Sequence, residues 1–227
     1  MTITDKEAKE MVVELFDKIR DSESTKNILS ITSGMTQGGL IEKKMPPISK
    51  FPRLKFKISS EDIKELVKFG ILTSENKISK NAANNFFKFK KELTPFEKVL
   101  YSILWKNGDL GKEHHLIAGV LNLENAGKGG IVFHEFGKYI SGQTNYILDQ
   151  HTLRCLAVYK ADPDQISKAR KLQEVKKSKY HEDLLKSYKE YYYSIESRLQ
   201  QEDMQDFFYH MDRLLFGVGK VIKFRGK

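Results

Sequence analysis

Apolar residues recur at intervals of three and four positions along most of this chain, and this spacing restricts its fold more than any other feature. Such intervals place side chains on one face of an α-helix. Near the amino terminus, Leu15 and Ile19 follow the pattern after Thr4 and Glu7, which form a capping box. The sequence therefore predicts an amphipathic helix over residues 4–21 and a mainly α protein.

Several other helices predicted by this spacing have clear ends. Thr94, Pro95 and Glu97 combine a capping hydroxyl, a proline in the first turn and a glutamate that reaches back. Gly70 is suited to end an earlier helix. The predicted helices after the first span residues 59–69, 80–92, 94–105, 112–123, 130–140, 150–160, 164–197 (as one or two helices) and 201–222.

Three stretches do not fit a helical pattern. Glycines and prolines in residues 33–52 predict an irregular loop. Residues 54–58 alternate apolar and lysine side chains, which predicts a short half-buried strand or an extended arm. Residues 71–79 favour a turn or small hairpin. We therefore expect a multi-helix globular protein with at most a short β hairpin or extended arm near residues 53–80.

The chain has 227 residues, enough for one large domain or two small ones. We expect an N-terminal helical region over residues 1–93, which includes the irregular loop. A core over residues 94–227 would contain the long C-terminal helices. The two regions are expected either as separate domains or as one integrated domain.

The charge balance is strongly basic, with 39 Lys and Arg residues against 30 Asp and Glu residues and a formal net charge of +9. A surplus of this size favours polyanionic partners. Nucleic acid comes first among these, ahead of an anionic membrane or an acidic protein. We therefore expect DNA, and double-stranded DNA in particular, as the partner.

A single cysteine, Cys155, excludes an intrachain disulfide, a zinc site with several cysteines and a four-cysteine iron–sulfur cluster. The six histidines lack a metal-ligand spacing. Residues 1–18 lack the apolar core of a signal peptide, and no 18-residue apolar run crosses a bilayer. We expect no cofactor, no metal site and no membrane, and a cytoplasmic protein that is nucleoid-associated if it binds DNA.

A glycine-rich turn at residues 126–130 precedes an apolar run at 131–133. Glycines that open a helix let backbone N–H groups approach a phosphate, and the helix dipole adds attraction. The candidate phosphate-binding residues are Gly127, Lys128, Gly129 and Gly130, with Lys128 adding a mobile positive charge. The alternative is a tight interhelical turn without a ligand.

Asp149 stands directly before a helical run, within the segment Ile-Leu-Asp-Gln-His-Thr-Leu-Arg at 147–154. An aspartate at this position stabilises a helix by about 1 kcal/mol as an N-cap, whatever the protein does. Catalysis is the other interpretation of Asp149. The two interpretations are not exclusive, because a catalytic aspartate can also lie at the start of a helix.

Together, the glycine turn and the 147–154 segment resemble the helix-hairpin-helix DNA glycosylase superfamily, which includes endonuclease III and the adenine glycosylase that acts on mispairs. In that family an apolar-Gly-apolar-Gly hairpin grips DNA phosphate. An Ile/Val-Asp-x-(His/Asn)-Val-x-Arg segment then supplies the catalytic aspartate. The resemblance covers roughly residues 94–160 and implies a helix-hairpin-helix-like element.

The resemblance implies that Asp149 stabilises positive charge on deoxyribose and orients a water as the N-glycosidic bond breaks. Bifunctional members carry a lysine two residues after the second glycine, and that position is Ile131 here. A monofunctional enzyme or an inactive relative is therefore expected. Lys128 acts as the amine only if the hairpin is shifted by three residues. Trp105 and Tyr101 are the candidate walls of a base pocket.

Lys128 also stands where the family prefers an apolar residue, so two alternatives stay open. One is a non-catalytic DNA-binding module, and the other is a helical interaction or regulatory protein with an acidic partner. A basic stretch in the C-terminal region either tracks a nucleic-acid backbone or forms a solvated helix face. Its members are Lys168, Arg170, Lys171, Lys176, Lys177 and Lys179.

Overall fold

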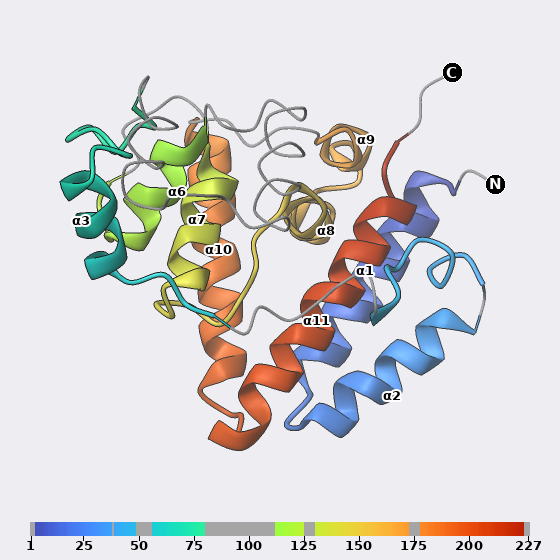
Figure 1. Ribbon diagram of the computed structural model, residues 1–227. Coiled ribbons are helices and arrows are strands. Elements are labelled where there is room, and N and C mark those ends of the chain that lie inside the picture. Colours follow the sequence, from blue (N-terminus) through green and yellow to red (C-terminus); the bar gives the residue numbers. More distant parts are fainter. Residues whose placement is uncertain are drawn as a thin grey trace. The chain divides into compact units, whose positions relative to one another are not determined.

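The computed structural model describes residues 3–37, 39–48, 56–79, 112–124, 130–172 and 178–224. These residues form helices joined by loops (Figure 1), and one isolated antiparallel β-bridge pairs Leu72 with Ile78. The helices are α1 (Asp5–Arg20), α2 (Thr25–Thr36), α3 (Ser60–Lys68), α6 (Glu113–Val120), α7 (Ile131–Ile140), α8 (Gln150–Lys160), α9 (Ile166–Arg170), α10 (Lys179–Glu196) and α11 (Gln201–Val221). The expected mainly α fold is thus confirmed. No helix in the described ranges has the length and apolar character to cross a membrane.

The chain divides into two compact units. The first, here called the terminal unit, comprises residues Met1–Arg53 and Asn145–Lys227 and so joins both ends of the chain. The second, the central unit, comprises residues Leu54–Thr144. The boundary expected between residues 93 and 94 lies outside the described residues.

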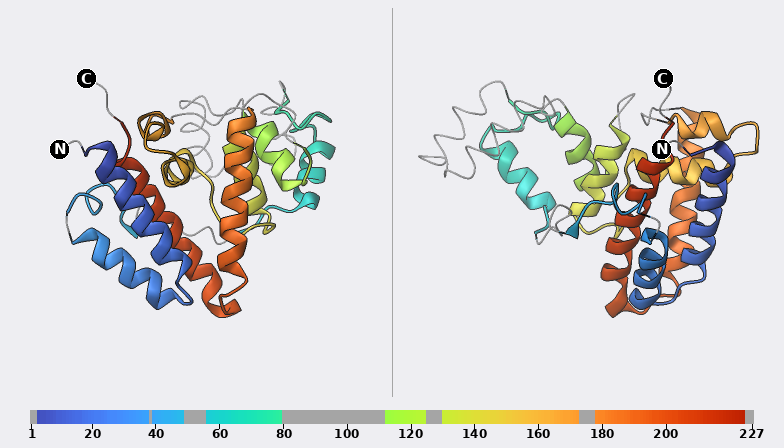
Figure 2. Two further views of the ribbon diagram at one scale, coloured as in Figure 1. Left: turned by 180° about the vertical axis from the view of Figure 1, so that it is seen from behind. Right: turned by 90° about the vertical axis from the view of Figure 1, so that its right-hand side faces the viewer.

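The terminal unit is built around α8, in which every residue from His151 to Val158 is buried. Helix α1 packs against α8 and buries Val12, Leu15 and Phe16 completely. Helix α11 packs against both α8 and α2, and α2 lies alongside it in Figure 2. Because α8 contacts helices from both ends of the sequence, it has almost no solvated face.

The central unit contains α3, α6 and α7. Its core joins residues from all three helices and from the bridge region: Ile63, Leu72, Ile117, Val120 and Ile140. The Ile58 N–H donates to the Ile140 carbonyl at 3.0 Å, which ties the segment before α3 to the end of α7. Residues 56–58 form no strand. Their conformation therefore corrects the strand alternative, because the backbone partner is a helix end rather than a second strand.

Local signals account for several helix ends. Thr4 and Glu7 form the predicted reciprocal capping box at the start of α1. Gly70, with φ 67°, follows α3 in the left-handed region that glycine adopts at low cost. The prediction for residues 164–197 is confirmed over α9 and α10, which are separate helices. The helices expected at 80–92 and 94–105 lie outside the described residues.

Helix α2 corrects the sequence analysis, because residues 33–36 of the expected loop are helical. Ser24 caps this helix by accepting from the Asn27 N–H, and Ile28 and Thr32 are buried. Gly34 lies on the exposed side, where a missing side chain costs no packing. Tertiary burial of one face therefore outweighs the weak helix propensity of glycine and threonine.

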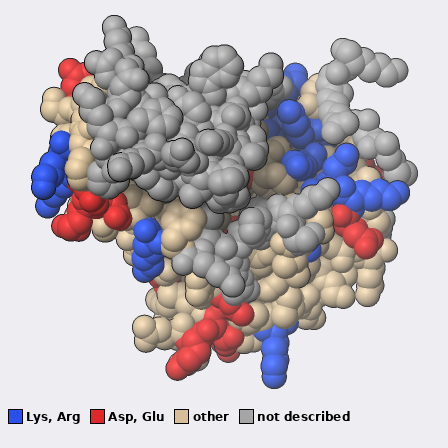
Figure 3. Space-filling model, viewed as in Figure 1, with Lys and Arg blue, Asp and Glu red and all other residues tan. Residues whose placement is uncertain are grey.

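On the face drawn in Figure 3, Lys and Arg side chains gather over α9 and the carboxyl-terminal end of α11. Both elements belong to the terminal unit. The exposed or half-buried lysines here include Lys171, Lys220 and Lys223.

Candidate functional site

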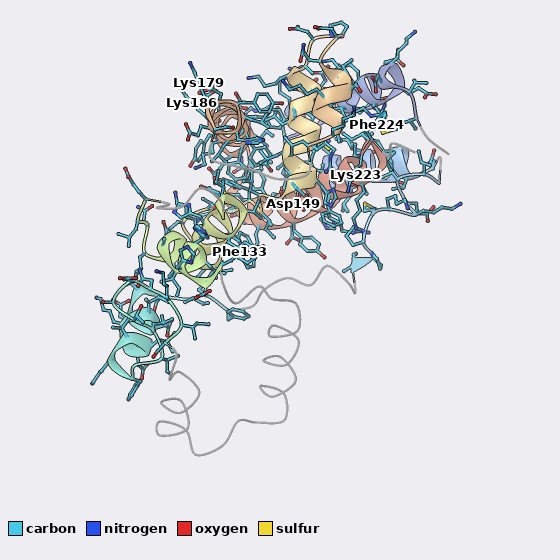
Figure 4. The ribbon with its side chains drawn as sticks, turned by 90° about the horizontal axis from the view of Figure 1, so that it is seen from above. Phe133, Asp149, Lys179, Lys186, Lys223 and Phe224 are labelled. Carbon is cyan, nitrogen blue, oxygen red and sulfur yellow. The ribbon has the colours of Figure 1, made fainter. Side chains whose placement is uncertain are left out.

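Asp149 is the N-cap of α8, with an extended backbone (φ −134°, ψ 176°). Its Oδ1 accepts from the His151 N–H at 2.6 Å and from the Thr152 N–H at 2.8 Å. The predicted N-cap is therefore confirmed. No described residue donates a hydrogen bond to Oδ2, and the side chain is half-buried. Figure 4 shows Asp149 at the amino-terminal end of α8.

The loop that leads to Asp149 is anchored by Asp212 of α11. The Ile147 N–H donates to Asp212 Oδ2 at 2.9 Å, and the Tyr188 hydroxyl donates to Oδ1 at 3.5 Å. Asp212 is 3% exposed, and this burial raises its pKa well above the ordinary value. The nearby charge of Asp149 raises the pKa further. Two carboxyl groups are therefore electrostatically coupled at the start of α8.

Arg154 is fully buried and bonds three different groups. Its Nε donates to the Leu172 carbonyl at 2.9 Å, and Nη2 donates to the same oxygen. Its Nη1 donates to the Gly219 carbonyl and to His151 Nδ1, each at 2.8 Å. Burial lowers the pKa of Arg154, and the charge of Asp149 acts in the opposite direction. Arg154 thus joins α8 to the segment after α9 and to α11.

The surroundings of His151 favour its neutral form. Burial lowers its pKa below the ordinary value, and Arg154 adds to this as a nearby positive charge. Because an arginine can only donate, its contact with Nδ1 assigns the ring proton to Nε2. The ring of Phe216 packs edge-on against His151 at 4.7 Å between ring centroids. His151 therefore links the start of α8 to the surface of α11.

Gly219 permits the close approach of α11 and α8. A Cβ atom on Gly219 would lie 2.3 Å from the His151 carbonyl oxygen, a distance that side chains do not reach. The same approach brings the Gly219 carbonyl within reach of Arg154. The position of this glycine is thus explained by backbone contact rather than by backbone flexibility.

Gly130, the one described member of the predicted phosphate-binding turn, is the N-cap of α7 in the central unit. Its φ is 72°, and a Cβ there would lie 2.0 Å from the His115 ring. Both observations require glycine at this position. Gly127, Lys128 and Gly129 lie outside the described residues, and so do the candidate base-pocket residues Trp105 and Tyr101.

The basic stretch predicted at 168–179 is only partly a surface feature. Lys168, Lys171 and Lys179 are exposed, whereas Arg170 is 2% exposed. Arg170 is therefore no member of a solvated face, because its guanidinium bonds groups at both ends of the chain. Residues 176 and 177 lie outside the described ranges.

The structure brings Asp149, His151 and Arg154 together, as their spacing in the motif suggests. Sequence reasoning missed Asp212 and Tyr188, because Asp212 and Ile147 are separated by 65 positions. One signal was available. Asp212 stands four residues after Phe208 and three before Leu215, on the apolar face of a predicted helix. An acid in that register indicates a buried polar contact.

Among the described residues, no group of three His, Cys, Asp or Glu side chains is placed to hold a metal ion. No protein-family model, curated protein or solved structure matches the chain. Its function therefore has to be inferred from its own residues and their chemistry.

Proposed function

We propose that this protein is a DNA-binding enzyme of DNA glycosylase type, which hydrolyses the N-glycosidic bond of a damaged, mispaired or modified base. Asp149 is the proposed catalytic residue. The observation that carries the proposal is that the two oxygens of its carboxyl group have different surroundings. Both capping bonds go to Oδ1, and no described residue bonds Oδ2. The net charge of +9 supports DNA as the partner.

Base excision needs a fixed negative group beside the sugar. As the bond between C1′ and the base nitrogen breaks, positive charge builds on the deoxyribose, and a preorganised carboxylate stabilises it. The water oxygen then bonds C1′, one water proton passes to Asp149, and the base leaves with the bonding electron pair and takes up a proton. Oδ2 is the oxygen proposed to face the sugar and the water.

The surrounding residues hold that carboxyl group in one place. Arg154 fixes α8 against two other segments, and Asp212 fixes the loop before Asp149. Placement within fractions of an ångström matters, because electrostatic stabilisation depends on groups that do not need to reorganise. In this proposal Arg154 and Asp212 are positioning residues.

Two further parts of the proposal concern the central unit. The turn residues, from Gly127 to Gly130 with Lys128, would bind DNA phosphate through backbone N–H groups and one ammonium. Trp105 and Tyr101 would hold the flipped base, whose extraction from the stack costs a few kcal/mol. The phosphate contact is tested by a Lys128→Ala change. This change should reduce the magnitude of the slope of log K against log salt for DNA binding by about 0.9.

Asp149→Asn tests the chemistry apart from the cap. An asparagine carbonyl can accept both capping N–H bonds, so the variant should unfold at the wild-type temperature and bind DNA normally. On labelled duplexes that carry 8-oxoguanine, uracil, alkylated bases or mispairs, base excision should fall by about 10²–10³-fold. A folded, DNA-binding Asp149→Asn protein with the full excision rate would overturn the mechanism.

The same assay decides between monofunctional and bifunctional chemistry. Because Ile131 occupies the position of the family's lysine, strand cleavage should appear only after alkali is added. Cleavage without alkali would instead point to Lys128 as an amine nucleophile, and Lys128→Ala should then abolish it. If the strands stay intact while the DNA still shows a salt-sensitive shift in gel mobility, both the monofunctional and the bifunctional reaction are excluded.

The second candidate is a non-catalytic DNA-binding module. It is favoured by the cap itself, because two hydrogen bonds to Oδ1 give Asp149 a structural reason to be there. Under this candidate the wild-type protein excises no base, yet Lys128→Ala still weakens DNA binding. Excision by the wild-type protein that depends on Asp149 would rule it out.

A further inference from the structure

We propose that Lys171, Lys220 and Lys223 form a phosphate-binding surface on the terminal unit, which contacts the backbone of the DNA duplex. The choice of DNA as the polyanion rests on the proposed function. The surface itself is inferred from two buried arginines, two aromatic rings and the absence of acidic partners among the described residues.

The first support is a framework of two buried arginines. Arg154 bonds the carbonyls of Leu172 and Gly219. Arg170 donates from Nε to the Ile222 carbonyl at 2.8 Å and from Nη2 to the Ile3 carbonyl at 2.9 Å. Its Nη1 pairs with Asp5, whose side chain is 40% exposed. The guanidinium groups of both arginines therefore bond groups within the protein, whereas the ammonium groups of the lysines are accessible to an external ligand.

Each lysine of the surface is the direct neighbour of a carbonyl held by this framework. Lys171 precedes Leu172, Lys220 follows Gly219, and Lys223 follows Ile222; the three carbonyls are those bonded by Arg154, Arg154 and Arg170. A guanidinium that bonds two segments fixes the distance between them. The backbone segments that carry the three lysines are thus held together by hydrogen bonds from the buried arginines.

Aromatic rings hold two of the ammonium groups. Lys171 Nζ lies 4.8 Å from the centroid of the Phe224 ring, and Lys220 Nζ lies 4.2 Å from that of Phe216. The Phe224 N–H donates to the Arg170 carbonyl at 3.2 Å, so this ring is itself anchored. Cation–π contacts of this kind restrict a long side chain before binding. The lysine side chains then lose less conformational entropy when a ligand binds.

The three ammonium groups are available to bind an external anion. None of them forms an ion pair with an acidic residue in the described ranges. Lys171 is exposed, and Lys220 and Lys223 are half-buried. By their positions in the sequence they follow α9 or lie at the end of α11, and these are the elements over which Lys and Arg side chains gather in Figure 3.

The surface adjoins the proposed catalytic residue. Phe216 packs on His151, whose N–H bonds Asp149, and the positive charge of Lys220 contributes to the lowered pKa of His151. In Figure 4, Lys223 and Phe224 lie on one side of α8, Lys179 and Lys186 of α10 lie on the other, and Asp149 lies between the two pairs at the end of α8. A strand bound along these lysines would therefore pass beside Asp149.

Duplex DNA fits this surface better than a membrane does. None of the exposed large apolar side chains in the described part of the chain belongs to it, so it offers nothing for insertion into a bilayer. Its rings lie beneath ammonium groups rather than in open solvent. Regularly spaced phosphates suit several separate point charges, and each contact releases counterions.

The test compares two triple variants of the full chain. Lys171→Gln/Lys220→Gln/Lys223→Gln removes the surface, and Lys26→Gln/Lys179→Gln/Lys186→Gln removes the same charge from exposed lysines of α2 and α10. Duplex binding is measured over a range of salt concentrations. The slope of log K against log salt should fall by about 0.9 for each lost contact, hence by about 2–3 in the first variant. The matched control should keep the wild-type slope.

Four outcomes separate this proposal from the enzymatic one. An unchanged slope in the surface variant, or an equal loss of slope in both variants, refutes the proposed phosphate-binding surface. The catalytic role of Asp149 is then decided separately by the excision assay. A selective loss of slope in a protein that excises no base supports the surface and refutes the enzyme. If the wild-type protein binds no DNA, and instead binds an acidic protein or anionic vesicles through these lysines, both proposals are wrong.

Discussion

At the scale of single residues, Asp212 has an unusual environment, because its carboxyl group lies among buried aromatic and apolar side chains of the terminal unit. Among the described residues, two donate hydrogen bonds to it, Ile147 and Tyr188. Burial therefore raises its pKa well above 3.8. The stabilisation that accompanies a raised carboxyl pKa is complete below this ordinary value and is lost as pH rises through the folded-state pKa.

Asp212→Asn should remove this pH dependence. The amide oxygen still accepts from the Ile147 N–H, and no proton is lost as pH rises. The unfolding free energy of the variant, minus that of the wild type, should therefore increase between about pH 4 and pH 7.5, as measured by urea unfolding. His151, whose pKa is lowered, has the opposite trend in both proteins and cancels in the difference.

Asp212→Ala is the matched control, because it leaves the Ile147 N–H without its acceptor. It should be about 1–3 kcal/mol less stable than Asp212→Asn at neutral pH. A pH-independent difference between the wild type and Asp212→Asn would contradict the raised pKa. Equal stability of the two variants would contradict the positioning of the loop by this side chain.

At the scale of elements, α6 and α7 cross at two glycines. A Cβ on Gly119 would lie 2.0 Å from the His134 carbonyl oxygen, and one on Gly137 would lie 2.1 Å from the Leu116 carbonyl oxygen. The two backbones are therefore in direct contact. The helix pair depends on these glycines for its spacing, and its connecting segment contains the turn proposed to bind phosphate.

Gly119→Ala should push the two helices apart. The expected loss is about 1–3 kcal/mol in unfolding free energy, because backbone cannot move aside as a flexible side chain does. Gly34→Ala in α2 is the control with the opposite sign. Nothing lies within 4 Å of its added Cβ, so it should stabilise the protein by about 0.5–1 kcal/mol. A neutral Gly119→Ala variant would refute the close crossing.

The helices that the sequence predicted well have their determinants within one or two turns. Thr4 with Glu7, and Asp149 with the N–H groups that follow it, are contacts over two or three positions. Helix α2 was missed because glycine and three threonines suggest a loop, and burial against α11 and α1 overrides that preference. Gly119 gave no signal, since the atom it must avoid belongs to another helix.

The site shows the same division between near and distant contacts. Asp149, His151 and Arg154 stand within one motif, and sequence reasoning placed the catalytic hypothesis there. The acceptors of Arg154 on Leu172 and Gly219 lie 18 and 65 positions away. Pairings at such distances depend on how helices pack, which periodicity does not specify.

At the scale of the whole molecule, the terminal unit closes the chain on itself, because it contains both ends of the sequence. A division read along the sequence does not reveal this, since local composition carries no information on which distant segments meet. Arg170 joins the two ends directly. It bonds Ile3 and Asp5 near one end and Ile222 near the other.

Arg170→Lys should loosen both ends at once. A single ammonium cannot reproduce three bonds in a planar fork, so the unfolding free energy should fall by about 1–3 kcal/mol. Amide hydrogen exchange should quicken in residues 3–8 and 218–224 more than in α10. Arg198→Lys is the control, because Arg198 is exposed and bonds the Ser194 carbonyl of its own turn; it should stay within about 0.5 kcal/mol of wild type.

The same variant links stability to binding, because Arg170→Lys conserves net charge. If the buried arginine positions Lys223 and Phe224, duplex affinity should fall by about two- to tenfold, which corresponds to the entropy of ordering one long side chain. The salt slope should stay near its wild-type value, since no phosphate contact loses its ammonium group. Wild-type affinity together with faster exchange at both ends would show that the surface needs the charges but not the arginine framework.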